Sequence, residues 1–429
     1  MGKLKELLFK DIHSKRAWTT GLIVLFGTLF AVALCLINVY LLDKPFYPYG
    51  TVFSPWPDTF GDLMFTLNVV LGNMQPYQYL GHNYFPFTYV LLYPLRMFPA
   101  QTGALLCLLI FASFMFAYVK QSLKKIPGSF WLMFIFTLFC YPVLFVAERA
   151  NIEMFIFMFL AGFVWAYNKK YFYAAAAFTA LAISLKLYPA VFLVLFAKDK
   201  LFKQISFALA LSIILFYISM LLTGNNMHGL ITNLAYFNDR YALGPWGVSA
   251  SHNLYSLLRL PLNVMLNYNS MSMETYRGIV SCFSLPHLIF SFVFFAAASL
   301  IVMFKEKSFW KNLFILTACS VWLPYVSFDY TLLDLLIPFF LFIWAKEPSS
   351  AKEDLFYCVG FAVLFIPLNW YWMCVSEFWR INIGVPIKAI TLGGMLVFVM
   401  FKDFSLPSLY DGFKQYAADV LPVSKKLFK

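Results

Sequence analysis

The sequence predicts an all-α polytopic membrane protein, a bundle of about twelve transmembrane helices. The composition is the first observation, because 62% of the 429 residues are hydrophobic and only 12% are charged. An average soluble domain is roughly half apolar and about a quarter charged. The second observation is that apolar runs near the ~20 residues needed to cross a bilayer recur along the chain. The third is that lysines gather in the short segments between these runs, as in cytoplasmic loops.

The first apolar run, Trp18 to Leu41, follows five basic residues: Lys3, Lys5, Lys10, Lys15 and Arg16. It is too long for the hydrophobic region of a signal peptide and lacks a small-residue cleavage site. We therefore expect an uncleaved first helix whose basic flank stays in the cytoplasm. The runs at 204–222 and 279–304 predict two further spans. The net charge of +12 lies mostly in short inside loops, so it requires no nucleic-acid partner.

Lysine positions constrain the rest of the topology. Lysine-bearing loops lie at 120–125, 169–170, 198–203, 305–311 and 346–352, and all are expected inside. The chain must cross an even number of times between consecutive inside loops. The segment 84–98 would add one crossing too many, and it has only about fifteen residues, broken by Pro86 and Pro94. We predict that it forms an interfacial or re-entrant helix.

From this topology we predict that residues 1–429 form a single transmembrane domain of a multi-pass plasma (inner) membrane protein. Two long extracytoplasmic loops are expected at 42–100 and 224–278, and a cytoplasmic tail at 402–429. Within the first loop, residues 62–71 predict a short helix that begins at a Gly61-Asp62 turn and ends at Gly72. The dipole of such a helix would keep Asp62 ionised.

Charged groups at membrane depth cost several kcal/mol unless they have a partner or a purpose. The topology brings such groups together beside the outer face of the bilayer. They come from five separate outer connections and include Asp58, Asp62, Glu148, Arg149, Glu153, Lys186, Asp239, Arg240, His252 and Asp329. Two of these connections are hinges between short apolar runs, at 186–189 and 327–330.

A mixed set of acids and bases suits a reaction in which a lipid phosphate leaves and a hydroxyl attacks. The hydroxyl needs a carboxylate base within hydrogen-bond reach, and Asp62 is the preferred candidate. The leaving phosphate needs cations that stabilise its developing charge. Lys186, with Arg149 or Arg240, is the preferred set.

Each of these residues also has a purely structural interpretation. Asp62 can act only as a helix N-cap, and Asp58 as a turn residue after Trp56-Pro57. Lys186 can extend its amine to the interface. Arg149 can form a local loop ion pair with its acidic neighbours, and His252 can belong to the loop structure.

Metal binding is not favoured. Asp58 and Asp62 are separated by three residues, and no other aspartate pair or His/Cys ligand set is compact enough. We therefore expect chemistry that needs neither a metal nor another cofactor.

Several short motifs, in order, resemble those of glycosyltransferase family 87, a GT-C fold group of polytopic enzymes. The first loop carries Gly61-Asp62-Leu63, Gly72, Pro76-Tyr77, Tyr84-Phe85-Pro86 and Tyr93-Pro94-Leu95. Later motifs are Arg149-Ala150-Asn151, Lys186-Leu187-Tyr188-Pro189 and Ser251-His252-Asn253. The resemblance covers about residues 55 to 345. The chain departs from it at Phe87, where a second proline is usual, and at Ala150, where glycine is usual.

The resemblance implies a GT-C-like bundle with juxtamembrane helices and an inverting hexosyltransferase, most similar to mannosyltransferases. The implied donor is a polyprenyl-phosphate-linked sugar, and the implied acceptor is a hydroxyl of a lipid or glycan. Asp62 would occupy the catalytic aspartate position. Substrate contacts are expected from Asp58, Tyr84, Asn151, Glu153, Tyr188, His252, Asn253 and Asp329.

Two other classes of polytopic protein compete with an enzyme. A transporter or lipid flippase would show internal repeats with helices broken near the midplane, and no such repeat is visible. A non-catalytic subunit of an envelope-assembly machine stays open. The sequence does not specify the sugar, the acceptor or the linkage.

Overall fold

The computed structural model of the protein describes residues 11–427 except 51, 53–59, 73–75, 79, 82, 249–250, 269, 348, 369–370, 377–378 and 403. Asp58 lies outside the described residues. The described part is almost entirely helical, which confirms the expected all-α membrane protein. A small antiparallel hairpin of β1 (Tyr371–Ser376) and β2 (Trp379–Asn382) is the exception within it.

Five described helices are long and apolar enough to cross a membrane: α2 (Ile12–Tyr40), α6 (Ala100–Leu123), α12 (Phe202–Leu222), α15 (Met273–Phe304) and α19 (Gly384–Phe401). A sixth span is possible if α7 (Ser129–Leu138) and α8 (Tyr141–Arg149) cross together, with a bend of 46° between them. The predicted spans at 18–41, 204–222 and 279–304 are thus present as α2, α12 and α15. The count of about twelve crossings stays a prediction, because the other helices are shorter.

The shorter helices follow one another along the chain with short breaks between them. They are α9 (Glu153–Asn168), α10 (Phe172–Leu185), η3 (Tyr188–Phe192), α11 (Leu193–Lys198), α16 (Phe309–Trp322), η6 (Asp329–Leu335), α17 (Leu336–Ile343) and α18 (Ala351–Phe365). The breaks after α10 and after α16 coincide with the predicted hinges at 186–189 and 327–330. Pro189 contributes to the first break, because it lacks an N–H and cannot continue the helical hydrogen-bond pattern.

The expected outer loops are themselves helical. They contain α3 (Phe46–Tyr49), α4 (Gly61–Gly72), η1 (Pro76–Gln78), α5 (Pro86–Leu92), η2 (Tyr93–Met97), α13 (Met227–Phe237), the π-helical turn η4 (Asn238–Ala242), η5 (Pro245–Gly247) and α14 (Leu254–Asn267). The short helix predicted at 62–71 is confirmed as α4. The segment 84–98 forms α5 and η2, of 7 and 5 residues, which are too short to span. The predicted tail carries α20 (Leu406–Leu427).

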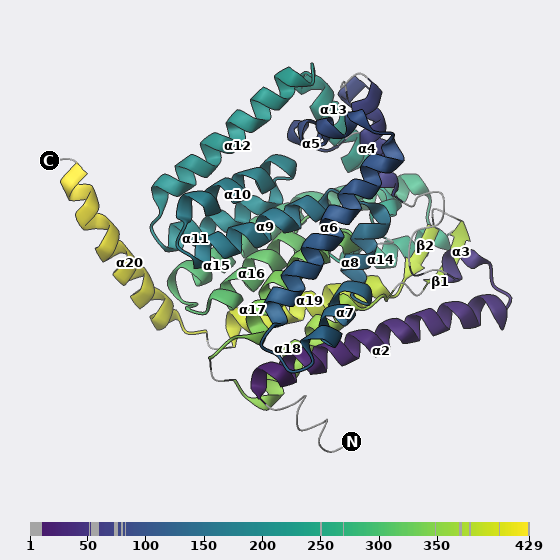
Figure 1. Ribbon diagram of the computed structural model, residues 1–429. Coiled ribbons are helices and arrows are strands. Elements are labelled where there is room, and N and C mark those ends of the chain that lie inside the picture. The colour runs from purple at the N-terminus through teal and green to yellow at the C-terminus, as the bar shows by residue number, and fades with distance from the viewer. Residues whose placement is uncertain are drawn as a thin grey trace.

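Figure 1 shows α4, α5 and α13 gathered at one end of the molecule, while α20 projects from the opposite side. Between them, α10 packs against both α9 and α12, and α18 packs against α2. Aromatic side chains such as Phe136, Phe157 and Phe314 are fully buried in this bundle. Because lipid is as apolar as these side chains, close packing rather than exclusion of water stabilises their contacts.

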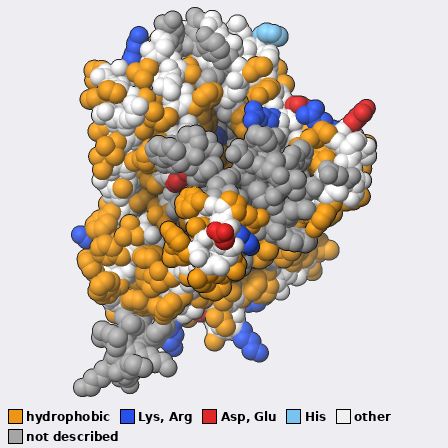
Figure 2. Space-filling view, turned by 90° about the vertical axis from the view of Figure 1, so that its right-hand side faces the viewer, with side chains coloured by type: hydrophobic (Ala, Val, Ile, Leu, Met, Phe, Trp, Pro, Cys, Tyr) orange, Lys and Arg blue, Asp and Glu red, His pale blue; other side chains and the backbone are white. Residues whose placement is uncertain are grey.

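The exterior is also apolar. Figure 2 shows one face on which hydrophobic side chains predominate and charged ones are scattered. Phe26 and Phe292 are among the large hydrophobic side chains that stay exposed on long helices. A water-soluble protein rarely exposes such extended apolar surface, whereas a bilayer solvates it.

Arg16 joins three helices, α2, α17 and α18. It is 2% exposed and lies 2.8 Å from the Asp354 carboxylate of α18. Its guanidinium also donates to the carbonyls of Phe342 and Ala345 at the end of α17. A cation there complements the negative end of the helix dipole. The basic flank of the first helix is therefore a structural connection as well as a topology signal.

Candidate functional site

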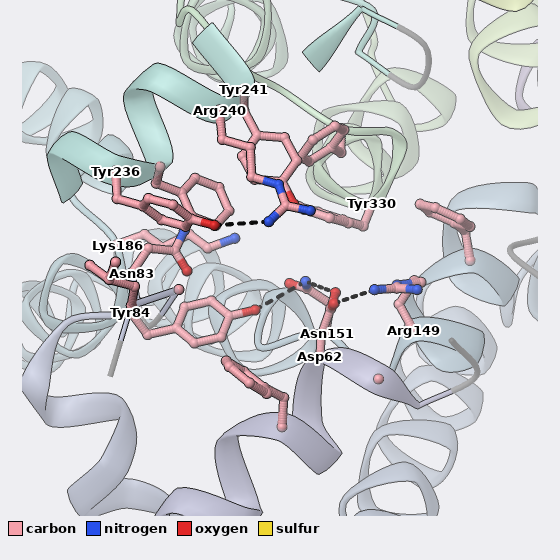
Figure 3. Close-up of a pocket in the computed structure, with 17 residues that line it drawn as sticks. Asp62, Asn83, Tyr84, Arg149, Asn151, Lys186, Tyr236, Arg240, Tyr241 and Tyr330 are labelled. Atoms are coloured by element: carbon pink, nitrogen blue, oxygen red, sulfur yellow. Dashed lines mark hydrogen bonds and ion pairs between the residues drawn. The ribbon is translucent and has the colours of Figure 1, made fainter. Parts of the chain in front are cut away.

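A cavity of about 550 Å³ opens among the helices at the α4 end of the molecule. This volume lies within the roughly 300–1,000 Å³ of small-molecule sites. Segments far apart in the sequence line it: Gly61, Asp62, Phe65, Leu80, Gly81, Asn83, Tyr84, Phe145, Arg149, Asn151, Lys186, Tyr236, Phe237, Arg240, Tyr241, Phe328 and Tyr330. Figure 3 shows the polar members directed toward one another across this space.

Asp62 is held by two partners from the turn between α8 and α9. Arg149 donates to one carboxylate oxygen at 2.5 Å, and the side-chain amide of Asn151 donates to the other at 2.6 Å. The same amide lies 3.2 Å from the Tyr84 hydroxyl. Each carboxylate oxygen retains a further lone pair, so Asp62 can still accept a proton or a hydrogen bond. These contacts differ from those of a simple helix cap.

Local backbone geometry brings these groups together. The amide of Phe60 donates to the carbonyl of Glu148 at 2.7 Å, which docks the start of α4 against the end of α8. Asp62 then lies in the first turn of α4, where the dipole favours a negative charge. Ala150 ends α8 with a φ of 47°, in the left-handed region that favours glycine. This conformation explains physically why glycine would suit the position, as the family resemblance suggests.

Lys186 extends from the hinge after α10 to the cavity wall. Its ammonium lies 2.6 Å from a Glu153 carboxylate oxygen, with Lys186 22% exposed and Glu153 fully buried. It also lies 4.9 Å from the centre of the Tyr330 ring and 5.9 Å from that of Tyr84. Such rings attract a cation with their faces. Lys186 is therefore held in place while part of it faces the cavity.

Glu153 belongs to a buried cluster behind Lys186. The Tyr188 hydroxyl contacts both the Glu153 carboxylate and that of Asp334, the latter at 2.6 Å. Glu153 also faces the Lys186 ammonium. The Tyr188 hydroxyl therefore lies between this ion pair and a second buried carboxyl group, that of Asp334.

The wall opposite Asp62 comes from α13 and η4. Arg240 donates to the Tyr236 hydroxyl at 3.0 Å, and its guanidinium lies 5.8 Å from the centre of the Tyr241 ring. The Phe237 and Tyr241 rings stack at 4.3 Å. Figure 3 shows Arg240 and its tyrosine neighbours across the cavity from Asp62 and Asn151. We call Tyr236, Phe237, Arg240 and Tyr241 the roof.

His252 and Asp329 form a separate buried cluster with Lys388 of α19. Asp329 lies 3.0 Å from His252 Nδ1 and 2.7 Å from the Lys388 ammonium. Burial alone would raise the pKa of Asp329, but Lys388 and His252 lower it to about 2. Burial lowers the pKa of His252, which outweighs the opposite effect of Asp329. None of the three side chains lines the cavity, although Phe328 and Tyr330 on either side of Asp329 do.

The structure thus gathers six predicted residues around one cavity: Asp62, Tyr84, Arg149, Asn151, Lys186 and Arg240. Glu153 and Tyr188 lie directly behind it. Asn253 caps α14 by accepting from the Ser256 amide, and it donates to the carbonyl of Pro324. The role of each residue stays a prediction.

Sequence reasoning missed Asp334, Lys388 and most of the aromatic lining. Asp334 and Lys388 are single charged residues inside apolar runs, a signal that was available. The roof tyrosines gave no such signal, since aromatic residues make up 21% of the chain.

No group of three or more His, Cys, Asp or Glu side chains among the described residues is placed to hold a metal ion. Among the described residues, the charged side chains that line the cavity are one carboxylate and three cations.

Comparison with known proteins agrees with this architecture. The model of glycosyltransferase family 87 matches residues 82–323, more than half of the chain. This segment contains Tyr84, Arg149, Lys186 and Arg240, whereas Asp62 precedes it. No curated protein and no solved structure matches the chain. Membrane helices and this match together establish that the chain belongs to glycosyltransferase family 87.

Proposed function

We propose that the protein transfers a hexosyl residue, specifically a mannosyl residue, from a polyprenyl-phosphate donor to a hydroxyl group of a lipid or glycan. The reaction takes place at the extracytoplasmic face of the plasma (inner) membrane and inverts the configuration of the anomeric carbon. The observation that carries the proposal is that Asp62, Arg149, Lys186 and Arg240 line one cavity.

In the proposed reaction the acceptor oxygen attacks the anomeric carbon while the bond from that carbon to the phosphate oxygen breaks. The electron pair of the broken bond stays on the phosphate. Asp62 takes the proton of the attacking hydroxyl as general base. Its hydrogen bonds to Arg149 and Asn151 fix the direction of the carboxylate, which favours catalysis by orientation.

The charges of the cavity support a phosphate leaving group. Arg149, Lys186 and Arg240 outnumber the carboxylate of Asp62, so an anion adds favourably to the cavity. Glu153 balances part of the Lys186 charge from behind. Arg149 and Arg240 carry planar guanidinium groups, which can bind phosphate oxygens with two parallel hydrogen bonds.

The aromatic lining supports a bulky, uncharged sugar between these groups. Tyr84, Tyr241 and Tyr330 combine an apolar ring with a hydroxyl, so they can contact both the ring faces and the hydroxyl groups of a sugar. Burial raises the pKa of Tyr84, and the Asp62 carboxylate adds to this effect. The Tyr84 hydroxyl therefore stays protonated and available as a donor.

A donor panel tests the proposal. Purified protein in lipid nanodiscs is incubated with radiolabelled polyprenyl-phosphate sugars and a membrane lipid extract, and the products are separated by chromatography. Transfer from polyprenyl-phosphate mannose that is lost in Asp62→Asn is the expected result. Transfer from a different hexosyl donor would correct the sugar.

The same assay addresses the competing functions. A transporter or flippase would move the lipid-linked sugar across proteoliposomes without a change in its mass. A non-catalytic assembly subunit, assayed without its partners, would neither transfer the sugar nor move the lipid-linked sugar across the membrane. Failure of every donor with full-length, folded protein would therefore reject the enzymatic proposal.

A further inference from the structure

Arg259 is a buried cation whose role the proposed reaction does not explain. It lies on α14, is 1% exposed and does not line the cavity. No ion pair of Arg259 occurs within the described part of the chain. Burying a charge without a counter-ion is costly unless its hydrogen bonds are satisfied. Such a residue needs a structural reason for its presence.

The guanidinium of Arg259 contacts the backbone at the end of the roof and directly after it. It donates to the carbonyl of Ala242, to that of Gly244 at 3.1 Å and to that of Tyr241 at 3.3 Å. Its Cζ atom lies 4.6 Å from the centre of the Tyr255 ring. These carbonyls are at the end of η4, where a helical turn leaves acceptors without internal donors.

Close packing around the same turn limits its freedom. A Cβ added at Gly247 would lie 1.9 Å from the carbonyl oxygen of Tyr241 and 3.1 Å from the Arg259 guanidinium. The Ser256 hydroxyl also donates to the Gly247 carbonyl at 3.2 Å. The turn at 241–247 is therefore fixed against α14 by several contacts, with Arg259 at their centre.

We propose that Arg259 is a positioning residue, which sets donor affinity by holding the roof turn so that Arg240 and Tyr241 face the cavity. This inference rests on the proposed function for its kinetic test. Tyr241 begins the turn that Arg259 binds, and Arg240 directly precedes it in η4, so we expect a change in the turn to move both side chains. An arginine fits this position because its planar fork reaches several carbonyls at once, whereas lysine presents a single ammonium.

Transfer kinetics provide the first test, with donor KM and kcat measured separately. Arg259→Met should raise the donor KM about 10- to 100-fold, while kcat changes less. This range corresponds to the loss of one hydrogen bond to a charged group, here the proposed contact between a displaced Arg240 and the donor phosphate. Arg259→Lys should restore part of the affinity. The double variant Arg259→Met with Arg240→Met should raise the donor KM by less than the product of the two single effects, because Arg259 acts partly through Arg240.

Arg16 supplies the matched control. It is another buried arginine that donates to backbone carbonyls at a helix end, and it does not line the cavity. Arg16→Met should destabilise the fold without raising the donor KM. An equal rise in both variants, a wild-type KM in Arg259→Met, or additive effects with Arg240→Met would each overturn the proposal.

Hydrogen exchange separates this proposal from the proposed function. The amides of residues 241–244, 246 and 247 should exchange faster in Arg259→Met and Arg259→Lys than in wild type, whether or not any sugar is transferred. If wild type transfers no sugar, the enzymatic proposal fails, and the exchange result still decides the role of Arg259. Unchanged exchange in both variants would refute the positioning role.

Discussion

Asp62→Asn is the most informative single substitution in this protein. The change removes the negative charge and the ability to accept a proton, while the side chain keeps its size. General-base catalysis contributes about 10² to 10⁴ in rate, which corresponds to roughly 2.7–5.5 kcal/mol of activation free energy. We expect transfer to fall by that factor.

The structure also predicts a cost in stability. Arg149 and Asn151 each donate to one oxygen of Asp62. An asparagine must turn its own NH₂ group toward one of these donors. Asn151 cannot easily flip, because its side-chain oxygen accepts from the amide of Glu153. A buried donor left without an acceptor costs about 1–3 kcal/mol. Arg149 and Asp62 are 19% and 20% exposed, so water compensates in part, and the free energy of unfolding should fall by an amount near the low end of that range.

Asp354→Asn is the matched control for this loss. Asp354 also pairs with an arginine, Arg16, at 2.8 Å, and neither residue lines the cavity. It should lower the melting temperature and leave transfer nearly unchanged. Asp62→Glu is the second comparison, because it keeps the charge and displaces the carboxylate by about one methylene. A misplacement of about 1 Å can reduce the rate about 10²-fold.

Single-turnover transfer with labelled donor, measured beside thermal unfolding of the same samples, checks this prediction. Asp58→Asn, in the same loop, should cost less than Asp62→Asn. Retention of more than about a tenth of wild-type transfer in folded Asp62→Asn would refute the assignment of the base, since even the low end of the range is 10²-fold. Loss of transfer in Asp58→Asn alone would move the base to that residue.

Three further predictions concern charge and topology. Lys186→Met should raise the donor KM, and it should also destabilise the fold because the buried Glu153 loses its cation. Adding Glu153→Gln should restore the melting temperature but not the donor KM. Recovery of both quantities in the double variant would contradict phosphate binding by Lys186. His252 is buried, and burial lowers its pKa. Below about pH 6.5 the unfolded chain therefore binds a proton that the folded protein does not bind. As the pH is lowered from there, the free energy of unfolding should decrease by up to about 1.36 kcal/mol per pH unit. Thermal unfolding measured from pH 8 to pH 5 should show this loss of stability in wild type and a smaller loss in His252→Asn. Equal losses in the two proteins would mean that another group causes the effect. In a variant that lacks the exposed Cys282, a cysteine introduced at Met227 should react with an impermeant thiol reagent in intact cells, whereas one introduced at Lys200 should not. Labelling at Lys200 would reject the predicted orientation.

The sequence by itself determined the class of the protein and many of its breaks. Hydropathy and chain length predicted the long helices, because partition between lipid and water depends on local composition. Gly61, Gly72 and Pro189 marked helix ends for equally local reasons. The short outer helix that carries Asp62 was predictable in this way, and the structure has it as α4.

Which side chains meet was decided only by the tertiary structure. Asp62 and Arg149 are 87 positions apart, and Arg259 and Ala242 are 17 apart on separate elements. The sequence predicted that most of these charged residues lie beside one face, but it offered no basis for separating the cavity from the buried cluster of His252, Asp329 and Lys388. That division depends on how the helices pack, because contacts at ion-pair range require a specific arrangement of several helices, whereas local composition determines only that each helix forms.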